Sequence, residues 1–264
     1  MKVIILCGGQ GTRLREETEY RPKPLVEVGG RPILWHIMKL FAHHGFRDFV
    51  LALGYRGNMI KDYFLNYHAR NSDFTVELLT HDVHYHRTNH NEDWQVTVAY
   101  TGERAMTGAR IVRAAAYLGN AENFAVTYGD GLCNVDLTSE FEFHVEHGSV
   151  GTVLGINPPS RFGELKTDVN HVIEFAEKPE LKGSWINGGY FFFRREFLDF
   201  LSDEDDCVLE QEPLSRLARE GQLRVFRHSG FWACMDTQRD KEYLEELWKG
   251  GDAPWVCAPE RPWT

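Results

Sequence analysis

Apolar runs alternate with helical patterns through the first half of the chain. Residues 2–6 form a short apolar run, which predicts a strand buried on both faces. After Pro32, apolar residues recur at helical spacing as far as Gly45, which predicts an amphipathic helix. The alternation continues with predicted strands at residues 47–54, 74–80, 94–100 and 123–131 and predicted helices at residues 57–68 and 109–119. Strands that alternate with helices indicate βαβ units and a mainly parallel sheet.

After about residue 150 the pattern changes. Strand-like runs joined by tight turns follow one another at residues 152–157, 163–168, 171–177 and 185–193, and helical patterns return at 211–221 and 236–250. The strand-like runs predict an antiparallel C-terminal extension. Residues 250–264 are rich in Pro and Gly, which predicts an extended tail. We therefore expect an α/β fold with a mixed, mainly parallel sheet, in a single domain over residues 1–264 whose core ends near residue 249.

Composition and charge narrow the function classes. The net charge of the 264 residues is −10, which argues against sequence-independent binding of nucleic acid. No apolar run approaches about 18 residues, so no membrane span is expected. The first strand begins where a signal peptide would carry basic residues, so none is visible. Five scattered cysteines without a CxxC pair favour reduced thiols in the cytoplasm, with neither zinc nor disulfides.

A glycine loop, CGGQGTR at residues 7–13, follows the first predicted strand. Backbone N–H groups in such a loop suit phosphate oxygens or the edge of a base. A dinucleotide fingerprint is excluded because the sequence from Gly9 reads GQGTRL, with Leu14 in the last glycine position. A P-loop is excluded because the first lysine after the loop is Lys23. With Arg13 attached, a phosphate site is favoured over a plain tight turn.

Lys23 and two aspartates are the other candidates for chemistry. Lys23 lies between two prolines, which restrict the backbone and direct the ammonium group, although a solvated lysine in a proline turn fits the same pattern. Asp130 ends a predicted parallel strand between glycines, a position that suits Mg²⁺. Asp236 follows another apolar run, where it or Thr237 could instead cap the next helix. Together with Arg13, these residues indicate a site for a metal and a phosphate.

The motifs GGQGTRL, RPKPLVEVGGRPIL, YGDG, EKP and NGG, in this order, resemble those of the sugar-1-phosphate nucleotidylyltransferases. The segments MTGARI and GFWACMDT point to the cytidylyl branch of that family. The resemblance extends from Met1 to about Trp255. It implies a Rossmann-like three-layer fold, Mg²⁺ as cofactor and a homo-oligomer. It also implies that CMP passes from CTP to α-D-glucose 1-phosphate, giving CDP-glucose and pyrophosphate for deoxysugar or surface polysaccharide biosynthesis.

The same resemblance assigns roles to residues by their positions. The nucleotide would contact Leu6, Cys7, Gly8, Gly9, Gln10, Gly11, Thr12, Arg13, Lys23, Arg110 and Gly129. The sugar phosphate would contact Tyr128, Lys178, Asn187 and Gly188. Asp130 and Asp236 would hold Mg²⁺ and, with Arg13 and Lys23, form the catalytic group. The chain departs from the pattern at Cys7, where the family usually has alanine, and at Ala105, where close relatives often have serine; for Cys7, packing is favoured over redox chemistry.

Several alternatives stay open at this stage. The chain could use another nucleotide or another phosphorylated substrate, because base choice depends on a few hydrogen bonds. It could also be a catalytically silent nucleotide-sugar binding protein, although the retention of the four catalytic candidates argues against that. A nicotinamide oxidoreductase is excluded by the glycine spacing. The four histidines at positions 81, 84, 86 and 90 could bind zinc or nickel, but an exposed loop is favoured.

Overall fold

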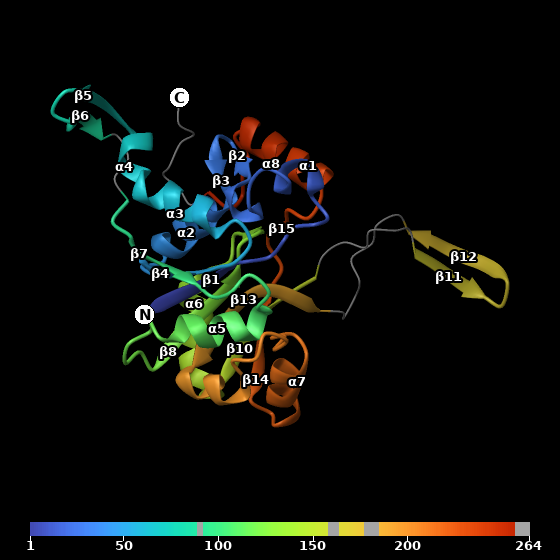
Figure 1. The fold of residues 1–264 in the computed structure, drawn as a ribbon. Helices are drawn as coiled ribbons and strands as arrows, with labels where there is room; N and C mark the ends of the chain where they lie inside the picture. Colours follow the sequence, from blue (N-terminus) through green and yellow to red (C-terminus); the bar gives the residue numbers. More distant parts are fainter. Residues whose placement is uncertain (89–91, 158–163, 177–184, 257–264) are drawn as a thin grey trace.

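A seven-stranded sheet forms the centre of the computed structural model, which describes residues 1–88, 92–157, 164–176 and 185–256 (Figure 1). The strand order is β14-β10-β13-β8-β1-β4-β7. The strands are β1 (Lys2–Cys7), β4 (Asp48–Leu53), β7 (Gln95–Tyr100), β8 (Asn123–Tyr128), β10 (Gly151–Ile156), β13 (Ile186–Arg194) and β14 (Leu223–His228). β13 runs antiparallel to both of its neighbours, and all the other adjacent pairs are parallel. The predicted mixed, mainly parallel sheet is confirmed.

Helices cover both faces of this sheet and complete three layers. Val3 and Ile5 of β1 point to one face, where they share a core with residues of α2 (Ile33–His43), α6 (Leu137–His147) and α8 (Gln238–Lys249). Ile4 and Leu6 point to the other face, against α5 (Thr107–Ala115), η2 (Arg195–Phe200) and α7 (Glu212–Arg219). Successive strand residues alternate between the faces, so a strand covered on both sides must be apolar throughout.

Short elements occupy the edges and connections. They are α1 (Arg15–Thr18), η1 (Lys23–Leu25), β2 (Glu27–Val28), β3 (Arg31–Pro32), α3 (Gly57–Leu65), α4 (Tyr67–Arg70), β9 (Gly131–Cys133) and β15 (Trp232–Cys234). Two hairpins, formed by β5 (Ser72–Glu77) with β6 (Asp82–Thr88) and by β11 (Glu164–Asp168) with β12 (His171–Ala176), project away from the layers (Figure 1). No helix of the described ranges is long and apolar enough to cross a membrane.

The structure corrects several predicted elements. The strand expected at residues 74–80 is β5, which pairs with β6 and lies outside the main sheet, so Phe74 and Val76 are exposed instead of buried. The histidine-rich segment contributes to β6 and is not a loop; His84 and His86 are exposed there, and His90 lies outside the described residues. The C-terminal extension is antiparallel only in part, because β14 runs parallel to β10.

Several elements were not predicted, among them α6 and β14. The expected end of the core near residue 249 coincides with the end of α8, and the single-domain organisation stays a prediction.

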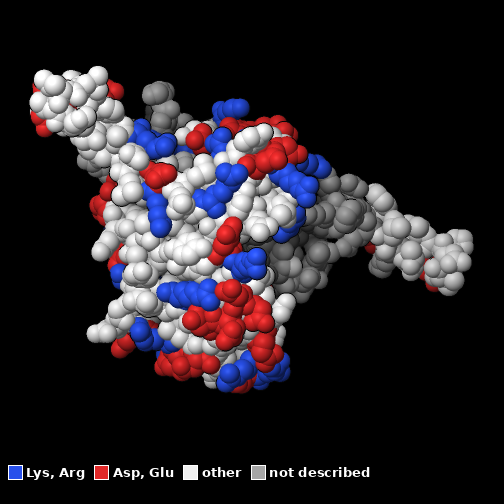
Figure 2. Space-filling model, in the orientation of Figure 1, with Lys and Arg blue, Asp and Glu red and all other residues white. Residues whose placement is uncertain are grey.

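Charges of both signs are mixed on the face of the molecule drawn in Figure 2. Acidic side chains gather in its lower half. Asp203 and Asp205 are acidic residues that pair with Arg113 of α5, at 2.6 and 2.9 Å. This face carries no continuous basic surface, in keeping with the acidic composition. An anionic ligand must therefore be bound by local cations.

Candidate active site

A cavity of about 520 Å³ opens beyond the C-terminal ends of β1 and β8. Such positions at the carboxyl edge of an open α/β sheet are where ligands bind. Its walls include every residue that was assigned to the nucleotide, together with Tyr128, Asp130 and Asp236: Leu6, Cys7, Gly8, Gly9, Gln10, Gly11, Thr12, Arg13, Lys23, Arg110 and Gly129. The structure thus brings these residues to one place, while their individual roles stay predictions. Lys178 lies outside the described residues.

Contacts with Thr18 of α1 fix the conformation of the glycine loop. Gly11 has a φ of +61°, and a Cβ atom there would lie 2.6 Å from Cγ2 of Thr18, so only glycine fits. The hydroxyl oxygen of Thr18 lies 2.9 Å from the carbonyl oxygens of both Gly11 and Leu14. Because Thr18 is buried, this contact fixes the loop against α1 and leaves its other side to the cavity.

A two-stranded ladder brings the two aspartates together from positions more than a hundred residues apart. β9 and β15 pair in antiparallel fashion with Gly131 opposite Cys234, and the backbone N–H of Met235 donates to the carbonyl oxygen of Asp130 at 2.9 Å. Thr237 caps α8, and its own N–H donates to the Asp240 carboxylate at 2.8 Å. The cap is therefore Thr237, and the carboxylate of Asp236 serves the cavity.

Two cations neutralise these two carboxylates. The ammonium group of Lys23 donates to Oδ2 of Asp130 at 2.7 Å and to Oδ1 of Asp236 at 2.6 Å. Burial lowers the pKa of Lys23, but the charge and hydrogen bonds of Asp130 and Asp236 outweigh it, so the pKa lies above its usual value and the ammonium stays charged. Arg13 donates to Oδ2 of Asp236 at 2.7 Å, and 74% of its side chain is exposed toward a ligand.

Arg110 is held in the wall of the cavity by four backbone carbonyl oxygens and one hydroxyl oxygen. Its guanidinium donates to five oxygens, on Gly8 at 3.2 Å, Leu53 at 3.0 Å, Thr101 at 2.9 Å, Gly102 at 2.8 Å and Glu103 at 3.3 Å. Only 4% of the residue is exposed, and burial lowers its pKa. These contacts tie the glycine loop to the ends of β4 and β7, and the predicted contact with nucleotide stays a prediction.

Tyr128 connects the cavity to the NGG segment. Its hydroxyl group donates to the carboxylate of Glu210 and lies 3.4 Å from Nδ2 of Asn187. Gly188 accepts a hydrogen bond at 2.7 Å from the indole of Trp232, which fixes the backbone beside Asn187. Burial and the nearby Glu210 raise the pKa of the Tyr128 hydroxyl, so it stays protonated. Glu210 was not predicted, because no local motif marks a partner 82 residues away.

Two cysteines lie close to these groups. Cys7 is fully buried, and burial raises the pKa of its thiol, which fits the packing role predicted for it. The sulfur of Cys234 and one carboxylate oxygen each of Asp130 and Asp236 all lie within 4.8 Å of one another. Cys234 was also missed, since a lone cysteine in a strand carries no sequence signal.

The donor set fits a divalent cation. Carboxylate oxygens are the ligands that Mg²⁺ prefers, and Asp130 and Asp236 already share one cation, the ammonium of Lys23. Among the described residues, this is the one group of three metal-ligating side chains close enough to bind one ion. The described histidines at positions 81, 84 and 86 form no such group.

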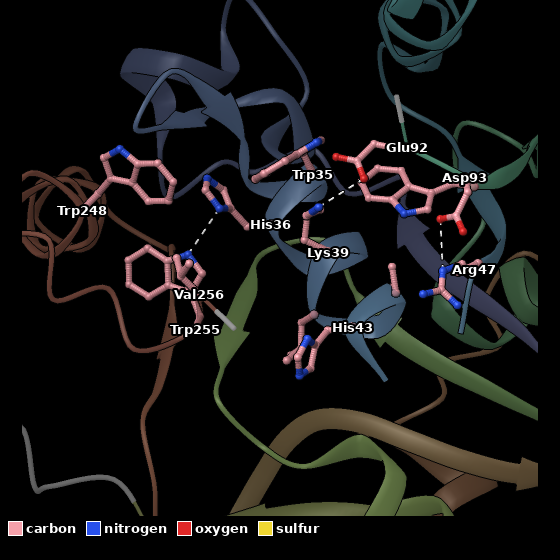
Figure 3. A pocket seen from close by; sticks show the side chains of 13 residues that line it. Trp35, His36, Lys39, His43, Arg47, Glu92, Asp93, Trp248, Trp255 and Val256 are labelled. Atoms are coloured by element: carbon pink, nitrogen blue, oxygen red, sulfur yellow. Dashed lines mark hydrogen bonds and ion pairs between the residues drawn. The ribbon is translucent and has the colours of Figure 1, made fainter. Parts of the chain in front are cut away.

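A second cavity of about 320 Å³ lies beside the N-terminal ends of β4 and β7 (Figure 3). The lysine and the arginine that line it form ion pairs with acidic residues: Lys39 pairs with Glu92 at 3.2 Å, and Arg47 pairs with Asp93 at 3.0 Å. Four tryptophans contribute to its wall: Trp35, Trp94, Trp248 and Trp255. This cavity lacks the glycine loop and is the weaker candidate for a phosphate site.

His36 fixes the end of the described chain in this second cavity (Figure 3). The indole N–H of Trp255 donates to Nδ1 of His36 at 3.3 Å, so the proton of the neutral ring lies on Nε2, which donates to the carbonyl oxygen of Val28 at 2.8 Å. Burial lowers the pKa of His36 to about 4.

Comparison with known proteins shows the family to which the chain belongs. The family model described as nucleotidyl transferase matches residues 2–233, most of the chain. The chain belongs to the nucleotidyl transferase family. Two relatives named glucose-1-phosphate cytidylyltransferase, from Salmonella typhi and Salmonella typhimurium, are each 48% identical to this nucleotidyl transferase over 257 residues, which cover 97% of this chain and 98% of theirs.

A solved structure supports the fold of this nucleotidyl transferase. The crystal structure of HddC from Yersinia pseudotuberculosis matches with a TM-score of 0.69 and 23% identity, covering 94% of this chain and 99% of that one. At this identity the match shows a common fold. The predicted three-layer nucleotidyltransferase fold is confirmed.

Proposed function

We propose that the protein transfers CMP from CTP to α-D-glucose 1-phosphate, giving CDP-glucose and pyrophosphate. The observation that carries this proposal is the glycine-loop cavity, in which Arg13 and Lys23 meet Asp130 and Asp236. The cytidylyltransferase relatives, 48% identical over almost their whole length, support both the nucleotide and the sugar phosphate.

The reaction explains why the cavity holds cations and carboxylates. A phosphate oxygen of the sugar 1-phosphate attacks the α-phosphorus of CTP in line, the new P–O bond forms, and the bond to the β-phosphate oxygen breaks as pyrophosphate leaves. The attacking oxygen is already anionic at neutral pH, so no general base is needed. The main barrier is the approach of two polyanions, and Arg13 and Lys23 offset their repulsion.

Mg²⁺ is the cofactor we propose for this reaction. Asp130 and Asp236 would hold it, and when bound it would neutralise charge on the phosphates. The protein's own groups would bind the nucleotide and the sugar phosphate. The glycine loop offers backbone N–H groups to the nucleotide, and Asn187 and Tyr128, whose side chains contact each other, are the partners we propose for the sugar phosphate.

A screen of pyrophosphate release tests the proposed function. Each of four nucleoside triphosphates is paired with several sugar 1-phosphates, and release is expected with CTP and glucose 1-phosphate. Release only with UTP or dTTP would overturn the choice of nucleotide. No release with any pair would favour the catalytically silent binding protein.

We further propose a homo-oligomer in the cytoplasm. The two projecting hairpins expose apolar side chains that a monomer would leave in water, including Leu79 at 94% and Val169 at 87% exposure. Cys7, Cys207 and Cys234 are free thiols, as expected in a reducing compartment.

The hairpins allow a direct test of the oligomer. Leu79→Asp and Val169→Asp are expected to lower the mass measured by sedimentation velocity. Leu65→Asp, at 81% exposure on α3, is the matched control and is expected to leave the mass unchanged. A wild-type protein that sediments as a monomer would refute the proposal.

A further inference from the structure

The ammonium group of Lys23 lies where a metal ion bridging the two aspartates would lie. Its nitrogen is 2.7 Å from Asp130 and 2.6 Å from Asp236, and only 11% of the side chain is exposed. Each aspartate is also largely covered, at 25% and 14% exposure. The pair of carboxylates therefore already has a buried cation of its own.

The ammonium and a divalent ion cannot use this position together. An ion at the usual 2.0–2.1 Å from both oxygens would lie within about 4 Å of the Lys23 nitrogen, where two positive charges repel strongly. Arg13 adds a second positive charge at 2.7 Å from Asp236. With two cations on two carboxylates, the local charge that would attract a free metal ion is already balanced.

A nucleotide offers Lys23 a different set of partners. The backbone of Lys23 is fixed in η1 between two prolines, so its ammonium can move only by turning about the bonds of its side chain. The glycine loop lines the same cavity, and the Cβ atom of Lys23 lies 3.4 Å from the Cβ position of Gly11. Phosphates bound on that loop would present anionic oxygens beside the lysine.

We propose that Lys23 excludes divalent cations from the aspartate pair until nucleotide phosphates draw its ammonium away, so that the metal enters with the nucleotide and not before it. The identity of that nucleotide rests on the proposed function; the exclusion of free metal rests on the contacts of Lys23 alone. Lys23 is thus a gate to the metal position as well as a partner of the phosphates. In this exchange the metal ion replaces the ammonium group at the carboxylates, and the phosphates replace the carboxylates as partners of the ammonium group. Each charged group therefore keeps a partner of opposite charge.

Binding of Mn²⁺ without any substrate tests this proposal. Free and bound Mn²⁺ are distinguished by electron paramagnetic resonance, and Lys23→Met is expected to bind the ion about tenfold more tightly than the wild type. Arg13→Met is the matched control, because it removes one positive charge from the same carboxylates at a position that is 74% exposed. Its effect is expected to stay within about threefold, since water screens an exposed charge.

Two results would overturn the proposal. Equal affinity in wild type and Lys23→Met would show that the ammonium does not compete with the ion. Equal gains in the Lys23 and Arg13 variants would show a general effect of charge instead of occupation of the metal position. Circular dichroism checks that each variant is folded, and Lys23→Gln replaces Lys23→Met if the latter does not fold. Because no substrate is present, the outcome is independent of the pyrophosphate-release screen.

Discussion

Replacing Arg110 by methionine should destabilise the protein more than it weakens nucleotide binding. Methionine fills a similar volume but donates none of the five hydrogen bonds of the guanidinium. The carbonyl oxygen of Leu53 keeps two other donors, the N–H and the hydroxyl group of Thr101, and that of Gly8 keeps the N–H of Tyr55.

The carbonyl oxygen of Gly102 sets the magnitude of the loss. It accepts from Arg110 at 2.8 Å and keeps no other donor within the described part of the chain. An oxygen that is fully buried and left unsatisfied costs about 1–3 kcal/mol, so this partly buried one lies toward the lower end, and the lost hydrogen bonds from a charged donor to the remaining oxygens add to it. We therefore expect the free energy of unfolding to fall by about 3 kcal/mol.

Urea denaturation and the KM for CTP together test this reasoning. Arg104→Met is the matched control, because Arg104 lines the same cavity but is exposed, and its effect on stability should stay within about 0.5 kcal/mol. An Arg110→Met variant that unfolds at the wild-type urea concentration while its KM for CTP rises about tenfold would contradict this expectation. Arg110 would then be a nucleotide ligand and not a support for the loop.

Two further predictions concern the carboxylates and a buried histidine. Asp130→Asn or Asp236→Asn should lower kcat by orders of magnitude while the protein stays folded by circular dichroism, whereas Asp93→Asn in the second cavity should keep its turnover; near-normal turnover in either site variant would refute the metal assignment. His36 has a pKa of about 4 in the folded protein, below the ordinary 6.5, so its contribution to stability is present above pH 6.5 and is lost as the pH falls toward 4. Between pH 7 and 5 the free energy of unfolding should fall by about 2 kcal/mol more in the wild type than in His36→Gln, and equal losses in urea denaturation would contradict this.

The sequence predicted the positions of the strands better than it predicted which strands pair with one another. The apolar run of β1 is buried because β4 and β8 flank it in the sheet and helices cover both of its faces, as the pattern indicated. Phe74 and Val76 gave a similar local pattern, yet they lie in a hairpin outside the sheet. Periodicity shows that a strand can form, but the choice of neighbour depends on contacts between distant residues.

In the candidate site, too, several residues could be predicted from the sequence but their contacts could not. Asp130, Asp236 and Lys23 carry recognisable motifs, so their candidacy could be read from the sequence. Their hydrogen bonds, and the contributions of Glu210 and Cys234, depend on distances that only the folded chain defines. A side chain whose importance comes from one partner far along the sequence leaves no local trace.

The ladder between β9 and β15 also sets the order in which the site can form during synthesis. Arg13, Lys23 and Asp130 leave the ribosome early, whereas Asp236 follows more than a hundred residues later, on the strand that completes the ladder. Until β15 pairs with β9, Lys23 has one of its two carboxylate partners. A nascent chain would therefore hold the parallel strands of its sheet before it could hold a metal ion, and catalytic competence would arrive only after β15 and Asp236 had been translated.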